Sequence, residues 1–257
     1  MKKAFILGLA LVFTTSLTPT VTFAAISNQN SQVTIQSTEK VDYAQAIIGQ
    51  DLNQLIEKVD DYKIQNPKAT KNQMTNFLKK QILSGSEQLK SSTLSAASDY
   101  IPGGVSLGPT EQEVFNSDIY CGFMALISGQ IAKDETSTHW SNNCGYHNDN
   151  ADAFRHSLWN ALMAKNCGKS YAESFANAHE TDYPNKAPES TMDYYNNSVG
   201  RNLGVAKPYN TSVGVDTQGI IRDVFAAVKS GKTKRFVGAD IGTLSYLVST
   251  NSNGALK

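Results

Sequence analysis

Apolar residues recur three or four positions apart along most of the chain beyond residue 42, which is the spacing of one face of an α-helix. The pattern first predicts an amphipathic helix over 43–62. After Pro67, Thr70 and Gln73 form a capping box that predicts the start of a second helix. We therefore expect residues 42–90 to form a helical hairpin.

Small residues, glycine and proline dominate residues 91–110, which predicts a linker. Beyond it, Thr110 and Glu113 resemble another capping box, for a helix that reaches about Ala132. The same periodicity predicts further helices at about 150–166, 170–180, 190–203 and 216–230. The fold class is therefore mainly α, with a multi-helix main domain over 111–257 preceded by the hairpin.

The first residues have the pattern of a secretory signal peptide, 1–24. Lys2 and Lys3 precede a short uncharged apolar run, and small residues lead up to Ala24. Polar residues then dominate 25–41, which predicts a disordered N-terminus of the mature chain. No later apolar stretch is long enough to cross a bilayer, so we expect a secreted, extracellular protein with no membrane span in its mature chain.

Charge and cysteine content limit the possible partners and chemistry. The chain has 23 Lys+Arg and 23 Asp+Glu, and signal cleavage removes two lysines, which disfavours nucleic acid as a partner. The odd set Cys121, Cys144 and Cys167 allows one disulfide and a free thiol, or three free thiols. Without a Cys-x-x-Cys pair, structural roles for these cysteines are favoured over a thiolate zinc site or catalysis.

The predicted helix at 150–166 carries costly polar residues on an apolar face. Asp152, His156, Trp159 and Met163 share one stripe, while the opposite stripe is also apolar. Such a helix is buried on both sides. A carboxylate and an imidazole one turn apart are expensive inside a protein unless they are paired or bind a ligand.

Two later helices repeat this combination. His179 falls on the apolar face of the 170–180 helix, with Glu180 beside it, and Ser170 with Glu173 resembles its capping box. On the 190–203 helix, polar residues follow one another four positions apart beside the apolar stripe: Asp193, Asn197 and Arg201. We expect Asp152, His156, His179, Asp193 and Arg201 to meet in one pocket between three helices.

These segments resemble a known family. Asp-Ala-Phe-Arg-His-Ser-Leu-Trp at 152–159, Ala-His-Glu at 178–180 and Met-Asp-Tyr-Tyr-Asn-Asn-Ser-Val-Gly-Arg at 192–201 are similar to the core of a bacterial domain of unknown function. The resemblance covers roughly residues 111–232. It implies a mostly helical domain of secreted and surface proteins, but no established activity.

Three hypotheses fit the polar residues. In the first, a divalent metal binds His156, His179 and carboxylates from Asp152, Glu180 or Asp193, and supports hydrolysis. In the second, His156 oriented by Asp152 is a general base. In the third, the groups only fix the packing of a non-enzymatic secreted binding or interaction module.

We favour the secreted hydrolase over the module. Its candidate catalytic residues are His156, His179, Asp152 and Glu180. Its candidate substrate-binding residues are Arg201, Asn197, Asp193 and Trp159. The sequence contains no H-E-x-x-H motif, and it names no substrate.

Overall fold

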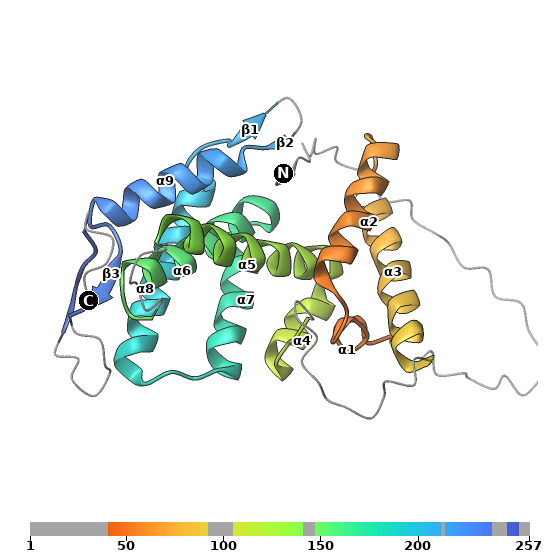
Figure 1. Cartoon of the computed structure of the whole chain (residues 1–257), viewed down its shortest axis with the longest axis horizontal. Coiled ribbons are helices and arrows are strands. Elements are labelled where there is room, and N and C mark those ends of the chain that lie inside the picture. Colours follow the sequence, from red (N-terminus) through yellow and green to blue (C-terminus); the bar gives the residue numbers. More distant parts are fainter. Residues whose placement is uncertain (1–40, 92–104, 141–146, 212–213, 238–245, 252–257) are drawn as a thin grey trace, which may run out of the picture.

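The computed structural model describes residues 41–91, 105–140, 147–211, 214–237 and 246–251 (Figure 1). These residues are mainly α-helical, as the sequence predicted. The predicted signal peptide, most of the predicted disordered segment and Cys144 lie outside the described residues. Among the described helices, none is long and apolar enough to cross a membrane.

The described residues form helices and two small antiparallel ribbons. The helices are α1 (Tyr43–Ile47), α2 (Leu52–Gln65), α3 (Lys71–Ser91), α4 (Pro109–Ser117), α5 (Ile119–His139), α6 (Asn150–Cys167), α7 (Lys169–Asp182), α8 (Ala187–Ala206) and α9 (Thr217–Lys229). The ribbons pair β1 (Asn210–Thr211) with β2 (Gly214–Val215), and β3 (Lys234–Phe236) with β4 (Leu247–Ser249).

Helices α2 and α3 form the predicted hairpin, at the right of Figure 1. The single helix predicted over 43–62 is wrong, because it is broken into α1 and α2. Gly49 has a φ of 79°, which is unfavourable for other residues, and the Asp51 side chain then caps α2. The capping box at Thr70 is confirmed, since its backbone N–H donates to the Gln73 side chain at 2.8 Å.

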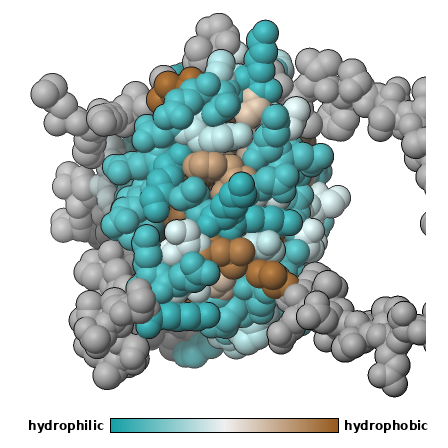
Figure 2. Space-filling view, turned by 90° about the vertical axis from the view of Figure 1, so that its right-hand side faces the viewer, coloured by the Kyte–Doolittle hydropathy of each residue, from teal (hydrophilic) through white to brown (hydrophobic). Residues whose placement is uncertain are grey.

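One buried apolar cluster joins the hairpin to α4 and α5. It contains Ile47 and Leu78 from the N-terminal helices together with Phe115 and Phe123. The outward surface on the hairpin side is mostly hydrophilic, with scattered apolar residues (Figure 2). This distribution agrees with the amphipathic pattern, because the apolar stripes face inward.

The helix predicted from Thr110 to about Ala132 is also two helices. Gly108 is the N-cap of α4, and its N–H donates to the Glu111 carboxylate at 2.8 Å, so the predicted pairing of Thr110 with Glu113 is wrong. Asp118 then ends α4 and caps α5 by accepting the N–H of Cys121. The capping box predicted at Ser170 is wrong as well, because α7 begins directly after Gly168.

Helix α6 lies at the centre of the molecule, in contact with α5, α7, α8 and α9 (Figure 1). Both of its stripes are buried, as predicted. Its crossing with α8 is close, because a Cβ on Gly200 would lie 2.1 Å from the carbonyl oxygen of Ser157. A Cβ on Gly204 would lie 2.2 Å from that of Ala161. These glycines bring the polar side of α8 against the polar side of α6.

A disulfide joins Cys121 at the start of α5 to Cys167 at the end of α6. The structure therefore excludes three free thiols, one of the two alternatives that the sequence left open. The bridge fastens one end of the α5–α6 pair and joins cysteines that are 46 positions apart in the sequence.

Candidate functional site

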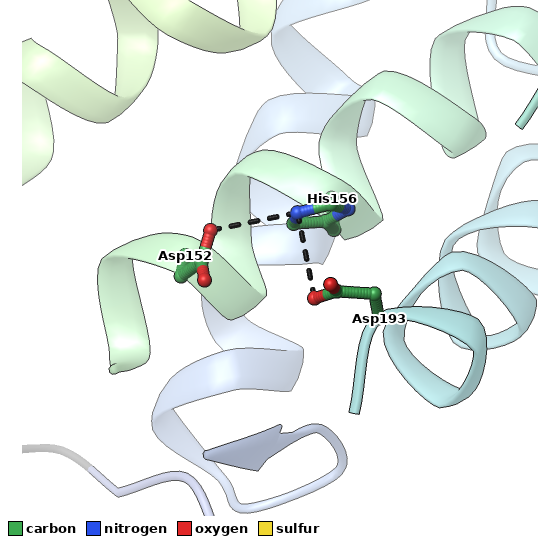
Figure 3. A group of neighbouring side chains, drawn as sticks. All are labelled: Asp152, His156 and Asp193. Carbon is green, nitrogen blue, oxygen red and sulfur yellow. Dashed lines mark ion pairs between the residues drawn. The ribbon is translucent and has the colours of Figure 1, made fainter. Parts of the chain in front are cut away.

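Two carboxylates face the same nitrogen of one imidazole at the α6–α8 crossing (Figure 3). Asp152 and His156 lie one turn apart on α6, and Asp193 lies on α8. The His156 Nε2 atom is 3.5 Å from Oδ1 of Asp152 and 3.5 Å from Oδ1 of Asp193. All three side chains are at most 5 % exposed. The helical spacing thus produced the predicted Asp152–His156 contact and the close crossing added Asp193.

Hydrogen bonds on the far side of the ring fix the state of His156. Its Nδ1 lies 3.3 Å from Oδ1 of Asn197, and that oxygen also accepts a hydrogen bond from Asn160 at 2.8 Å. An oxygen facing Nδ1 requires the proton on Nδ1. The lone pair of Nε2 therefore points towards Asp152 and Asp193. An imidazole held in this way by its other N–H is typical of metal-binding histidines.

Arg155 supplies a positive charge beside Asp152 and His156. Its Nη2 donates to Asp152 Oδ1 through a short hydrogen bond, and lies 3.0 Å from His156 Nε2. The sequence prediction missed this residue among its candidates. The available signal was its spacing, since it is adjacent to His156 and three positions after Asp152 on one helix.

Further buried carboxylates surround the group. Glu180 Oε1 lies 4.0 Å from His156 Nδ1, and Glu189 Oε1 lies 2.8 Å from the exposed His147. The Oδ1 atom of Asp193 has no hydrogen-bond donor among the described residues. Four acidic side chains are therefore buried close together, with few cations to balance them.

Burial and mutual repulsion set the protonation of these groups. Burial, with the charges of Asp152 and Glu180, raises the pKa of Asp193 to about 8. Burial and Arg155 lower the pKa of His156 to about 3, so the ring is neutral at physiological pH. Burial alone would raise the pKa of Asp152, but His156, Arg155 and the Asn148 N–H outweigh it and hold that pKa below its ordinary value. Burial raises the pKa of Glu180.

His179 lies in a different environment. Its Nδ1 is 2.8 Å from Oε1 of Glu111, a buried residue that the sequence prediction missed. The His179 side chain is 35 % exposed and its ring packs edge-on against Trp159. The expected metal partner of His156 is therefore not part of the converging Asp152–His156–Asp193 group. Helical phase placed His179 on an inward face, but could not indicate which neighbour it meets.

The remaining predicted residues join the site by different routes. Arg201 donates to Asn160 at 3.0 Å, and Asn160 bonds to Asn197 beside His156. Arg201 also pairs with Glu173 at 3.2 Å. Trp159 donates its indole N–H to the carbonyl oxygen of Ala125 and packs among other rings. Arg201 and Asn197 thus position His156, while Trp159 contributes packing.

The fold and the site together define a mainly α-helical domain with a buried His/Asp cluster where α6 crosses α8. Residues 121–232 match a family that is described as a domain of unknown function (DUF6973). No curated protein and no solved structure is similar to the chain at a significant level. The match contains α6, α7 and α8 and so contains every member of the His/Asp cluster.

Proposed function

We propose that the chain is a metal-dependent hydrolase whose centre is Asp152, His156 and Asp193. The observation that carries the proposal is the distance of 3.5 Å from one nitrogen to each carboxylate oxygen. Two tetrahedral ligands with metal bonds of about 2.1 Å lie about 3.4 Å apart. One imidazole and two carboxylates suit zinc, manganese or ferrous iron, and they leave a position for water.

The charge of the cluster supports a cation. Asp152, Asp193, Glu180 and Glu189 are each at most 5 % exposed. Burying a carboxylate without pairing is costly, and proteins avoid the cost by protonation, by a counter-ion or by a metal. Burial and its acidic neighbours raise the pKa of Asp193 to about 8, so this carboxyl keeps its proton at neutral pH without a cation. A divalent ion would replace that proton.

The chemistry that follows is hydrolysis. A bound metal lowers the pKa of a coordinated water and polarises the bond to be cleaved. The water oxygen bonds to the electrophilic carbon or phosphorus, the bond to the leaving group breaks, and one water proton passes to the leaving group. Glu180 suits the role of proton carrier, because it lies beside His156 and burial raises its pKa.

Metal binding tests the proposal before any substrate is known. Chelator-treated full chain is titrated with Zn²⁺ and Mn²⁺ by calorimetry, and the loaded protein is assayed on ester, amide and phosphodiester substrates. We expect one ion per chain, and loss of binding in Asp193→Asn. The matched control is Asp134→Asn, which removes an exposed carboxylate outside the site. An unmodified chain that binds no divalent ion would falsify the metal-dependent mechanism.

A second candidate is the non-enzymatic binding module. The observation in its favour is that Asp152, His156 and Asp193 are nearly inaccessible, with at most 5 % exposure each. In that case His156→Ala should lower the free energy of unfolding by about 3–5 kcal/mol, because removal of a buried ring leaves a cavity. Chelator should then leave the melting temperature of the unmodified chain unchanged.

A further inference from the structure

Arg155 contacts two of the atoms that a metal would need. Its Nη2 donates to Oδ1 of Asp152 and lies 3.0 Å from Nε2 of His156. The same two atoms belong to the group that could hold an ion. The guanidinium therefore stands beside the cation position, with its positive charge directed at the ligand atoms.

A guanidinium and a metal cannot use these atoms together. The proton on Nδ1 leaves Nε2 with a single lone pair. An N–H donor at 3.0 Å uses that lone pair, whereas a metal must approach it to about 2.1 Å. Binding of an ion at His156 thus requires Nη2 to move away from the ring.

We propose that Arg155 is the resident cation of the metal-free site and that a divalent ion displaces it. This inference rests on the proposed metal centre. It accounts for a chain that tolerates a buried acidic cluster without an ion, since the guanidinium partly compensates the charge of Asp152. The side chain of Arg155 is 35 % exposed, so its charged end has solvent available when it leaves.

Metal affinity distinguishes displacement from coexistence. Zn²⁺ is titrated into the chelator-treated full chain, Arg155→Gln, Arg155→Lys and the control Arg222→Gln. Arg222 is a matched control because it lies on α9 with its side chain 69 % exposed, paired to Asp216. We expect Arg155→Gln to bind Zn²⁺ at least about tenfold more tightly than the unmodified chain. The Arg222 variant should bind as the unmodified chain does.

A spectroscopic readout separates displacement from a general charge effect. The arginines of the chain are Arg155, Arg201, Arg222 and Arg235, so their guanidinium signals are few enough to resolve by NMR. The Arg155 signal is assigned by its loss in Arg155→Lys. Addition of Zn²⁺ should change it from a restrained to a freely rotating guanidinium, while the Arg201 signal stays unchanged.

The outcomes separate this inference from the function on which it rests. Equal or weaker Zn²⁺ binding by Arg155→Gln, or an Arg155 signal that stays restrained with Zn²⁺ bound, overturns the displacement but leaves the metal centre. Absence of binding in the unmodified chain and in both Arg155 variants overturns both. Binding that appears only when Arg155 is replaced also overturns both, because the ion then does not displace the guanidinium in the unmodified chain. If Arg155→Gln does not fold without metal, the Arg155→Lys titration and the NMR readout still decide.

Discussion

Replacement of Gly200 by alanine tests whether the close crossing of α6 and α8 builds the site. A Cβ at this position would lie 2.1 Å from the carbonyl oxygen of Ser157, although real Cβ contacts essentially never fall below 3.0 Å. The two helix backbones would have to separate by about 1 Å, because the obstacle is backbone and cannot rotate away. Overpacking of this kind costs about 3 kcal/mol, and the higher helix propensity of alanine returns about 1 kcal/mol.

We therefore expect Gly200→Ala to lower the free energy of unfolding by about 2 kcal/mol, measured by urea denaturation. The matched control is Gly129→Ala on α5, whose Cβ would meet only Trp159 at 3.6 Å and should be neutral or slightly stabilising. The Gly200 variant should also bind Zn²⁺ at least about tenfold more weakly, since metal ligands tolerate shifts of only about 0.2 Å. Equal stability of the two variants would refute the argument for the crossing.

Four further predictions concern the rest of the chain. Replacing Cys121 by serine should cost about 3–4 kcal/mol of unfolding free energy, because the bridge closes a loop between partners 46 positions apart; reducing agent should then no longer affect the melt. In the metal-free protein, burial and acidic neighbours raise the pKa of Asp193 to about 8, so the folded state keeps a proton that the unfolded state has already lost. Below pH 6.5 the lowered pKa of His156 has the opposite effect on stability and offsets that of Asp193. The free energy of unfolding should therefore fall by about 2 kcal/mol between pH 6.5 and about 8, and Asp193→Asn should abolish that fall. Export predicts that secreted material begins just after Ala24, and N-terminal sequencing that finds Met1 would contradict it. Because one buried cluster joins the hairpin to α4 and α5, fragments cleaved within 92–104 should elute together on gel filtration; separation would instead indicate that 42–90 is an independent domain.

Periodicity predicted the helices well because each one buries a single apolar face. It failed at the junctions, where a continuous pattern conceals a break. The apolar spacing runs through Gly49 and through Asp118 without interruption, although a positive φ ends one helix and an aspartate cap starts the next. Both breaks had a local signal, since glycine and aspartate are the residues that helix ends favour.

Contacts of the candidate site within one helix could be predicted from the sequence, whereas contacts between helices could not. Asp152 and His156 interact within one helix, so helical spacing alone placed them together. Asp193 required the packing of α8 on α6, which the sequence predicted only as a shared pocket. Arg155 lay outside both buried stripes, and Glu111 meets His179 across 68 positions. Long-range pairing depends on which helices become neighbours, and the spacing within one helix carries no such information.

The hydrogen bonding of other acidic residues in this chain separates a structural network from an ion site. Asp182 shows what a structural carboxylate looks like here, since its two oxygens accept the N–H groups of Thr110 and Glu111 at the start of α4. Asp193 differs, because its Oδ1 is buried without a donor among the described residues while facing a nitrogen lone pair at 3.5 Å. Two acceptors that face one another repel unless a proton or a cation lies between them. In the metal-free site Arg155 donates to that lone pair, and the buried Asp193 carboxyl keeps its own proton below about pH 8, where its raised pKa holds it. Above that pH the Asp193 carboxylate adds a negative charge that Arg155, already paired with Asp152, does not balance, so tighter Zn²⁺ binding as the proton leaves is the behaviour that a structural network would not show.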